Sequence, residues 1–422
     1  MRLLARGTWG SLARAAGEGR ALAPFCIVGA DAGQRMSTAV TTTGGSLAIP
    51  SQVTDEVGAG GRSSVSGITA TVFGATGFLG RYIVNQLGRM GSRVIIPYRC
   101  QDTKFAHLQV MGDLGQIVRL PQFDIRSDAA VAHAIRKSNV VINLIGADVD
   151  TWKWKLEEVH TDIPARIARA CAEAGHVDRL LHFSAAGAAP TATSRRLRTK
   201  FAGEVAVREI VPEATILRPG PVIGSEDRFS RRIAKMVRQW GPLFPLVDDG
   251  QRLVQPTFVK DVGEVTIKAM RDPAAIGRTY DLVGPETLSM LQMLDIICDA
   301  LKEPRAHTPV PRELLSPTIG KFHSVLGSAA PVPYFNSWFA ADMLAENDTD
   351  LVADPAHGTY EDLKHTPRSA TSGLPLDHVK HYRLGGYAKG RLHKQSDTEQ
   401  MSESAFGPMG SKLLKYPGLD TW

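Results

Sequence analysis

A glycine-rich stretch, Gly74–Gly80, constrains the fold of this chain more than any other feature of its sequence. Its three glycines follow the spacing G-x-x-G-x-x-G, after a β-branched apolar run at 68–73 that predicts a buried strand. The residues at 79–87 repeat apolar side chains every four positions and predict a helix. In such a strand-turn-helix unit the glycines permit a sharp turn, backbone approach to a pyrophosphate, and close packing of the helix.

Segments typical of strands and helices alternate after this motif. The expected strands are residues 94–96, 117–120, 140–145, 180–183 and 215–217. The clearest expected helices are residues 129–137 and 163–174. This alternation predicts an α/β fold with a Rossmann-type doubly wound parallel sheet. Beyond about residue 224 the alternation loosens, which indicates a smaller, irregular C-terminal lobe.

The expected organisation has five segments, beginning with a mitochondrial transit peptide at 1–35. Its first thirty residues carry four arginines and a single acid, Glu18, although a disordered basic tail has the same composition. The remaining segments are a flexible arm at 36–66, an NADP-binding Rossmann domain at 67–224, a smaller C-terminal lobe at 225–345 that completes the fold, and an extended tail at 346–422.

Composition excludes several classes of protein. The net charge of +6 comes from basic residues that are spread along the chain among acids, which does not indicate nucleic-acid binding. No apolar run reaches the eighteen residues that a transmembrane helix needs. The four cysteines lie far apart and form no metal-binding or disulfide pattern, so we expect no metal site.

The choice of dinucleotide is expected to depend on the end of the second strand. There Tyr98 and Arg99 follow the strand, and a guanidinium at this place favours the 2′-phosphate of NADP. Asp102 lies nearby and could serve the ribose hydroxyls of NAD instead. Because Asp102 lies past the strand end, the placement favours NADP(H).

Longer motifs make the chain resemble a known family. They span residues 61–67, 74–81, 94–100, 111–116 and 139–146, and the resemblance covers about 61–284. The chain is similar to atypical, extended short-chain dehydrogenases/reductases, in particular the nucleotide-binding accessory subunits of mitochondrial respiratory complex I (NADH:ubiquinone oxidoreductase). The resemblance implies a peripheral protein on the matrix side of the inner membrane. Its expected partners are other complex I subunits and, through peripheral contact, the lipid of the inner membrane.

Motif and resemblance together assign the residues that hold NADPH. Asp124 and Ile125 are expected to border the adenine and Pro219 the nicotinamide end, although Asp124 also fits a turn and Leu144 and Ile145 also fit a buried strand. The full set is Gly74, Ala75, Thr76, Gly77, Phe78, Leu79, Tyr98, Arg99, Asp124, Ile125, Leu144, Ile145, Gly146, Ser184, Lys200 and Pro219.

The catalytic residues of the resembled family are incomplete in this chain. Short-chain dehydrogenases use a serine, a tyrosine that transfers the proton, and a lysine four residues after the tyrosine. Ser184 and Lys200 are present, but the tyrosine position holds Arg196. A guanidinium stays protonated and cannot cycle a proton, so no catalytic residue is expected. Ser184 also fits a strand end, and Lys200 can still bind a ribose.

Two functions remain open from the sequence. The first is a non-catalytic accessory subunit of complex I that carries NADPH as a structural cofactor; Arg196 favours it. The second is a free mitochondrial NADPH-dependent reductase or isomerase acting on a lipid or quinone precursor. Trp152 and Trp154 are interpreted as a packing or partner-facing corner. A basic run at 228–238 is typical of a solvated helix face, or of a face that meets acidic lipid or an acidic partner.

Overall fold

The computed structural model describes residues 61, 64–99, 101–113, 115–240, 245–305, 307–310, 346 and 349–383. All of these residues belong to one compact unit of the chain. The expected transit peptide at 1–35 lies outside them, as do most of the expected arm at 36–66 and residues 384–422 of the expected tail.

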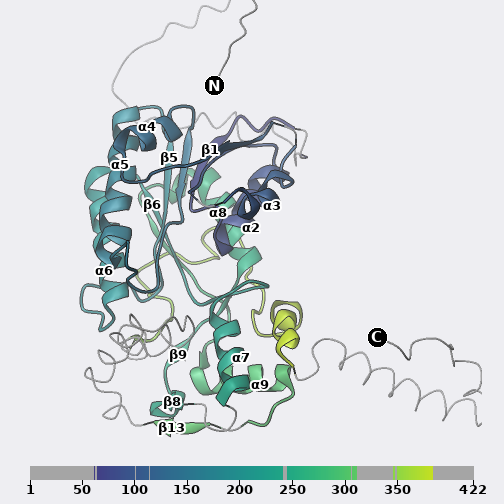
Figure 1. Ribbon diagram of the computed structural model, residues 1–422. Helices are drawn as coiled ribbons and strands as arrows, with labels where there is room; N and C mark the ends of the chain where they lie inside the picture. Colours follow the sequence, from purple (N-terminus) through teal and green to yellow (C-terminus); the bar gives the residue numbers. More distant parts are fainter. Residues whose placement is uncertain are drawn as a thin grey trace, which may run out of the picture. The chain divides into compact units, whose positions relative to one another are not determined.

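A parallel sheet of seven strands forms the centre of the described part of the chain (Figure 1). In spatial order its strands are β11 (Thr279–Leu282), β6 (Thr215–Pro219), β5 (Arg179–Phe183), β4 (Val140–Asn143), β1 (Thr69–Phe73), β2 (Arg93–Pro97) and β3 (Ile117–Leu120). The chain runs outward from β1 through β2 and β3 and then returns to the other side of β1 at β4. This order confirms the expected Rossmann-type fold, in which ligands bind where the strand order reverses.

The central strand β1 is apolar because both faces of the sheet are covered. Its Ala70 lies opposite Val94 of β2 and Val140 of β4, and all three side chains are buried. Buried parallel strands therefore appear in the sequence as short continuous apolar runs.

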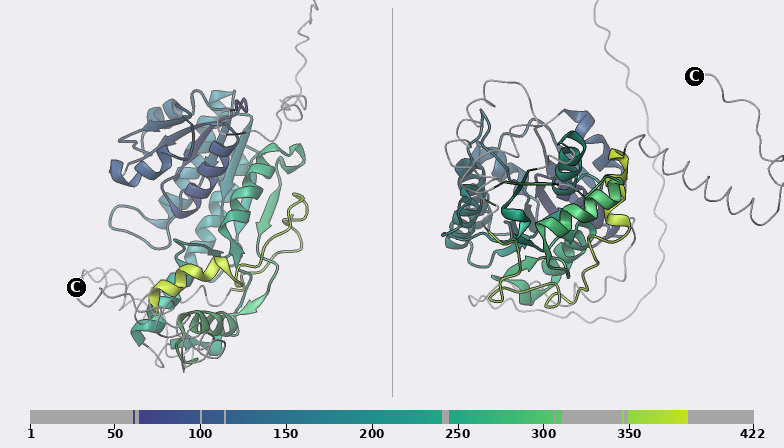
Figure 2. Two further views of the ribbon diagram at one scale, coloured as in Figure 1. Left: turned by 90° about the vertical axis from the view of Figure 1, so that its right-hand side faces the viewer. Right: turned by 90° about the horizontal axis from the view of Figure 1, so that it is seen from below.

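Helices pack on both faces of the sheet (Figures 1 and 2). On one face lie α2 (Phe78–Arg89), α3 (Ala106–Gln109) and α8 (Val259–Arg271), which share one hydrophobic cluster through Leu87, Leu108 and Val262. On the other face lie α4 (Asp128–Ile135), α5 (Ile163–Ala174) and α6 (Arg195–Ile210), which share another through Val131, Ile167 and Val207.

The helix α5 begins and ends at the residues that the sequence predicts. Pro164 lies in its first turn, where a missing N–H costs no hydrogen bond. Gly175 ends it with φ of 65°, a left-handed conformation that glycine adopts without strain.

The sheet extends past residue 224, where the sequence analysis ends the Rossmann domain. Both α8 and β11 come from the segment that it assigned to the C-terminal lobe, and β11 pairs with β6. The C-terminal lobe is therefore smaller than the segment 225–345 that the sequence analysis assigned to it. Its core joins α7 (Phe229–Trp240), α9 (Met290–Leu301) and the 3₁₀ segment η8 (Leu374–Tyr382).

Residues 349–383, assigned to an extended tail by the sequence analysis, pack into the fold. The N–H of Gly358 donates to Thr279 of β11 at 3.0 Å, and its carbonyl accepts from the N–H of Asp281 at 2.8 Å. Tyr360 is 2% exposed, and its hydroxyl lies 2.7 Å from that of Thr257. This segment therefore continues the hydrogen bonding of the sheet beyond β11.

The described helices include none that combines the length and the hydropathy needed to cross a bilayer.

Candidate cofactor site

The glycine motif forms a tight turn between β1 and α2. Gly74 has φ of +80°, which disfavours any residue with a side chain. A Cβ at Gly74 would lie 3.1 Å from the carbonyl carbon of Leu144, so the turn lies against the end of β4. The N–H of Gly77 donates to the carbonyl of Gly74 at 3.0 Å, and α2 begins at the next residue.

Gly80 brings the first turn of α2 against this loop. A Cβ there would lie 2.5 Å from both the Cα and the carbonyl oxygen of Ala75, so any side chain would push the helix away. The glycines thus allow the tight turn and the close helix packing that a dinucleotide-binding loop needs. The α2 N-terminus faces the space that a pyrophosphate would occupy.

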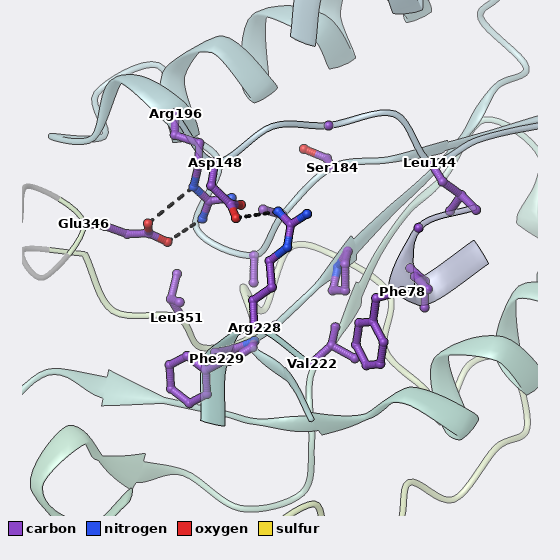
Figure 3. A pocket seen from close by; sticks show the side chains of 18 of the residues that line it. Phe78, Leu144, Asp148, Ser184, Arg196, Val222, Arg228, Phe229, Glu346 and Leu351 are labelled. Carbon is purple, nitrogen blue, oxygen red and sulfur yellow. Dashed lines mark hydrogen bonds and ion pairs between the residues drawn. The ribbon is translucent and has the colours of Figure 1, made fainter. Parts of the chain in front are cut away.

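A cavity of about 390 Å³ extends from this turn across the carboxyl ends of β4, β5 and β6 (Figure 3). Half of the residues expected to bind the cofactor line it: Gly74, Gly77, Phe78, Leu79, Leu144, Gly146, Ser184 and Pro219. The other half do not line it: Ala75, Thr76, Tyr98, Arg99, Asp124, Ile125, Ile145 and Lys200. The cavity therefore covers the pyrophosphate and nicotinamide end of the expected site.

Ser184 lies in the wall of this cavity, and Lys200 contacts it from behind. Ser184 is 3% exposed, and within the described part of the chain its hydroxyl has no hydrogen-bond partner. Lys200 Nζ donates to the main-chain carbonyl of Ser184 at 3.2 Å and lies 3.5 Å from where a Cβ of Gly146 would be. A buried hydroxyl without a partner at a cavity wall is suited to a ligand, so these residues fit a nicotinamide nucleotide.

The two bases behind this wall both have lowered pKa values. Burial, and then the charge of Arg196, lowers the pKa of Lys200 to about 8. Burial, followed by Lys200 and Arg196, lowers the pKa of His160 to about 2. The Nε2 of His160 accepts a hydrogen bond from the N–H of Ala147 at 3.1 Å. His160 is therefore a neutral acceptor and no source of a proton.

Arg196 lies where short-chain dehydrogenases have their tyrosine, and it is held by an ion pair. Its guanidinium pairs with the carboxylate of Glu346, with 3.3 Å between Nε and Oε2 (Figure 3). The two side chains are 15% and 7% exposed. The expected proton donor is thus replaced by a guanidinium, which Glu346 holds in place from a distant part of the sequence.

A second acid, Asp148, lies beside this pair in the cavity. It contacts Arg228 at 2.8 Å and Arg232 at 3.8 Å. Burial alone would raise the pKa of Asp148, but the guanidiniums of Arg196 and Arg228 outweigh it, so the pKa lies below its ordinary value. Asp148 is therefore ionised at neutral pH.

At the expected adenine end, the side chains of Tyr98 and Asp102 contact each other. Tyr98 is 4% exposed and its hydroxyl donates to the Asp102 carboxylate at 2.6 Å. The guanidinium carbon of Arg99 lies 5.2 Å from the centre of the Trp154 ring, and that of Arg126 lies 3.9 Å from it. Two arginines thus gather on one tryptophan just past β2.

The structure places Asp124 and Ile125 in separate environments. The Asp124 carboxylate accepts from the N–H of Arg126 at 3.0 Å, which is the geometry of a turn residue. Ile125 is 7% exposed and belongs to the hydrophobic cluster under α4 and α5. Their expected contact with adenine stays a prediction.

Sequence reasoning missed several residues of the site. Arg228 and Arg232 were visible only as part of a basic run, in which Arg228 directly precedes α7 and Arg232 lies in its first turn. Their neighbours on that helix contact other groups, Arg238 meeting Glu303 at 2.8 Å. Other members of the cavity wall that no motif signals include Asp148, Arg252, Glu346 and Leu351.

Comparison with known proteins decides the family. Residues 70–282 match the NAD dependent epimerase/dehydratase family. The chain is 43% identical, over 68% of its length and 73% of the other, to the mitochondrial NADH dehydrogenase [ubiquinone] 1 alpha subcomplex subunit 9 of Mus musculus. The chain belongs to this subunit family. The subunit 9 of Arabidopsis thaliana is 37% identical, over 78% of this chain and 81% of that protein. The mitochondrial NADH-ubiquinone oxidoreductase 40 kDa subunit of Neurospora crassa is 37% identical, over 78% and 83%.

Solved structures share the fold of this subunit family. The NADPH-dependent quinone oxidoreductase QOR2 from Escherichia coli, complexed with NADPH, superposes with a TM-score of 0.55 at 16% identity, covering 72% of this chain and 97% of that one. A UDP-glucuronic acid 4-epimerase from Bacillus cereus in complex with NAD gives 0.51 at 18% identity, over 58% and 88%. At these identities the likeness shows the fold alone.

Proposed function

We propose that this chain is a non-catalytic accessory subunit of mitochondrial complex I, on the matrix side of the inner membrane, that holds NADPH as a structural cofactor and supports assembly of the peripheral arm. The observation that carries the proposal is the ion pair between Arg196 and Glu346 at the position of the proton donor. The partners are the other complex I subunits, as the names of the relatives indicate.

The residues around the cavity support binding without turnover. A bound dinucleotide supplies hydride chemistry, but reduction of a carbonyl also needs a proton donor. The guanidinium of Arg196 does not release its proton at physiological pH. Lys200 directs its ammonium to the main-chain carbonyl of Ser184, which suits a ribose contact. Hydride transfer to a carbonyl therefore lacks the proton transfer that must accompany it.

The choice of NADPH over NADH is supported by the groups past β2. Asp102, the one candidate for the ribose hydroxyls of NAD, accepts the Tyr98 hydroxyl. Arg99 is exposed beside the Trp154 ring and offers a guanidinium to a 2′-phosphate. Arg126 on the same ring adds a second guanidinium, although it also pairs with Glu158 at 2.8 Å.

A structural role fits the way the cavity is built. Its wall joins the turn at 74–80 with Ser184 after β5, and with Glu346 and Leu351 more than 150 residues later. A ligand there contacts parts of the fold that are far apart in sequence. At a hundred times its dissociation constant, such a ligand stabilises the folded state by about 2.7 kcal/mol.

The decisive experiment follows the absorbance of bound NADPH while assembled complex I oxidises NADH, with and without added quinone. We expect no oxidation of the bound NADPH during turnover. Repeated, stoichiometric oxidation that stops in a Ser184→Ala variant would contradict the proposal.

The second candidate, a free NADPH-dependent reductase or isomerase, is favoured by the contact of Lys200 with Ser184, which lines the cavity. Native electrophoresis of mitochondrial membranes separates the two functions. An accessory subunit migrates with a very large complex, whereas a free reductase migrates near the mass of a single chain, 45.6 kDa.

Trp152 supports a contact with another subunit. Its side chain is 99% exposed, which is rare for tryptophan, and exposed tryptophans often anchor protein interfaces. A Trp152→Ala variant is expected to bind NADPH normally and to assemble into the complex less efficiently. Unchanged assembly would place the partner contact elsewhere.

A further inference from the structure

The guanidinium of Arg99 contacts the aromatic ring of Trp154 and no hydrogen-bonding group among the described residues. Its central carbon lies 5.2 Å from the centre of that ring, and the residue is exposed. A cation–π contact is made by the charge of the guanidinium and uses none of its N–H groups as hydrogen-bond donors. The N–H groups of Arg99 therefore remain available to a phosphate.

The residue that carries this ring, Trp154, is fixed by its surroundings. It is half-buried and packs against the hydrophobic cluster that contains Ile125. Its N–H donates to the carbonyl of Thr151 at 3.2 Å, and the N–H of Thr151 donates to the Trp154 carbonyl at 2.9 Å, so the two residues close a turn. A half-buried ring on a hydrogen-bonded turn is a fixed surface for an exposed side chain such as Arg99.

A second arginine, Arg126, packs on the same ring and is itself anchored. Its guanidinium carbon lies 3.9 Å from the ring centre. Its Nε and Nη2 donate to the two carboxylate oxygens of Glu158 at 2.8 and 3.1 Å, and Nη2 also donates to the carbonyl of Lys153 at 2.9 Å. Because Glu158 offsets its charge, Arg126 contributes mainly to holding the ring in place.

The contact with a fixed ring restricts the motion of Arg99 before any ligand binds. An exposed arginine populates many rotamers, and a ligand that binds it must pay for ordering them. A side chain that already lies on a ring has lost part of this freedom. Only a ligand that touches Arg99 gains from this, so the gain applies to NADPH and not to NADH, which lacks the 2′-phosphate.

We propose that Trp154 is a positioning residue for cofactor selection: its ring holds the Arg99 guanidinium just past the end of β2, where that guanidinium meets the 2′-phosphate of NADPH. The inference rests on the proposed function, because it needs the adenine end of NADPH beside Arg99. Trp154 acts through Arg99, so its effect on the choice of cofactor disappears when the guanidinium is removed.

The test compares the dissociation constants of NADPH and NADH for the purified full-length chain, by equilibrium dialysis. Trp154→Leu keeps an apolar side chain but removes the aromatic face. It is expected to reduce the preference for NADPH by about three- to tenfold, the effect of having to order one arginine side chain on binding. Trp154→Phe keeps an aromatic face and is expected to keep most of the preference. In an Arg99→Ala background, Trp154→Leu is expected to change the preference no further.

A matched control comes from the same turn. Trp152 lies two residues before Trp154 and is 99% exposed, so its ring holds no other side chain. Trp152→Leu makes the same chemical change as Trp154→Leu and is expected to leave the preference for NADPH unchanged. Thermal unfolding of each variant shows that it is folded before its affinities are compared.

The outcomes separate this inference from the proposed function. An unchanged preference in Trp154→Leu, or equal weakening of NADPH and NADH, overturns the inference and leaves NADPH binding intact. Tighter NADPH binding in Trp154→Leu also overturns it, because the ring would then compete with the phosphate for Arg99. If Trp154→Leu does not fold, Trp154→Phe decides, since a folded ring-bearing variant without the preference contradicts the inference. Failure of the unaltered chain to bind NADPH overturns the proposed function as well.

Discussion

The guanidinium of Arg196 on α6 and the carboxylate of Glu346 form an ion pair across 150 residues of sequence. Because both side chains are largely buried, neither charge can be left without the other at low cost. Arg196, at the position expected to hold the tyrosine of short-chain dehydrogenases, thus also connects Glu346 to the cavity wall.

Breaking this pair is expected to destabilise the fold. Glu346→Gln leaves a buried guanidinium with less compensation and is expected to cost about 3 kcal/mol in the free energy of unfolding, measured by urea denaturation. The matched control is Arg305→Gln, which breaks the pair with Asp299, where both partners are more than half exposed; it is expected to cost less than about 1 kcal/mol. Equal costs would show that burial of the pair is unimportant.

The close approach at Gly80 gives a second prediction. Gly80→Ala places a Cβ 2.5 Å from the backbone of Ala75, so α2 must shift, at a cost of about 1–3 kcal/mol. The variant is also expected to bind NADPH more weakly, because the shift displaces the α2 N-terminus. Gly61→Ala is the control, since nothing lies within 4 Å of a Cβ there. Thermal unfolding with and without NADPH measures both effects.

Arg99 is expected to select the phosphorylated cofactor. Arg99→Ala is expected to weaken NADPH binding by roughly ten- to a hundredfold and to leave NADH binding almost unchanged, because about 1.4–3 kcal/mol resides in the phosphate contact. The control is Arg93→Ala. Arg93 is also exposed, but it lies at the start of β2, at the opposite end of the strand from Arg99. Equal losses for NADPH and NADH would assign Arg99 a structural role.

Acid is expected to destabilise the protein through a buried histidine. His182 is 4% exposed, and burial, followed by the charge of Lys200, lowers its pKa to about 3. The unfolded chain takes up this proton near pH 6.5 and the folded chain does not, so stability is lost as pH falls below 6.5. Between pH 7 and pH 5 the loss amounts to about 2 kcal/mol for this group.

A His182→Gln variant measures that contribution. Its free energy of unfolding is expected to fall by about 2 kcal/mol less between pH 7 and pH 5 than that of the unaltered protein. His133, on the exposed side of α4, provides the control substitution. The same pH dependence in all three proteins would mean that His182 is protonated in the folded state.

The sequence predicted the parts of the fold whose signals are local. The helix at 163–174 and the strand at 117–120 have the predicted bounds, because periodicity, a first-turn proline and a terminal glycine act within a few residues. The strand β11 was missed. It has four residues, and its Asp281 is 2% exposed, which no apolar pattern would predict.

Asp281 can be buried because its partner comes from elsewhere in the chain. His357 Nδ1 lies 3.2 Å from its carboxylate. The same limit applies to the candidate site: the glycine turn, Ser184 and Lys200 follow motif spacing, whereas Glu346 reaches Arg196 only through the fold. Local sequence patterns cannot predict pairs of residues that are so far apart in the chain.

The cavity wall combines residues from early and late parts of the chain, so it can be completed only late in synthesis. A chain is synthesised from its N-terminus, so the glycine turn exists long before Glu346 and Leu351 can complete the cavity wall. A chain that ends before residue 346 lacks two residues of this wall, and we expect it to hold a dinucleotide less tightly than the full-length chain.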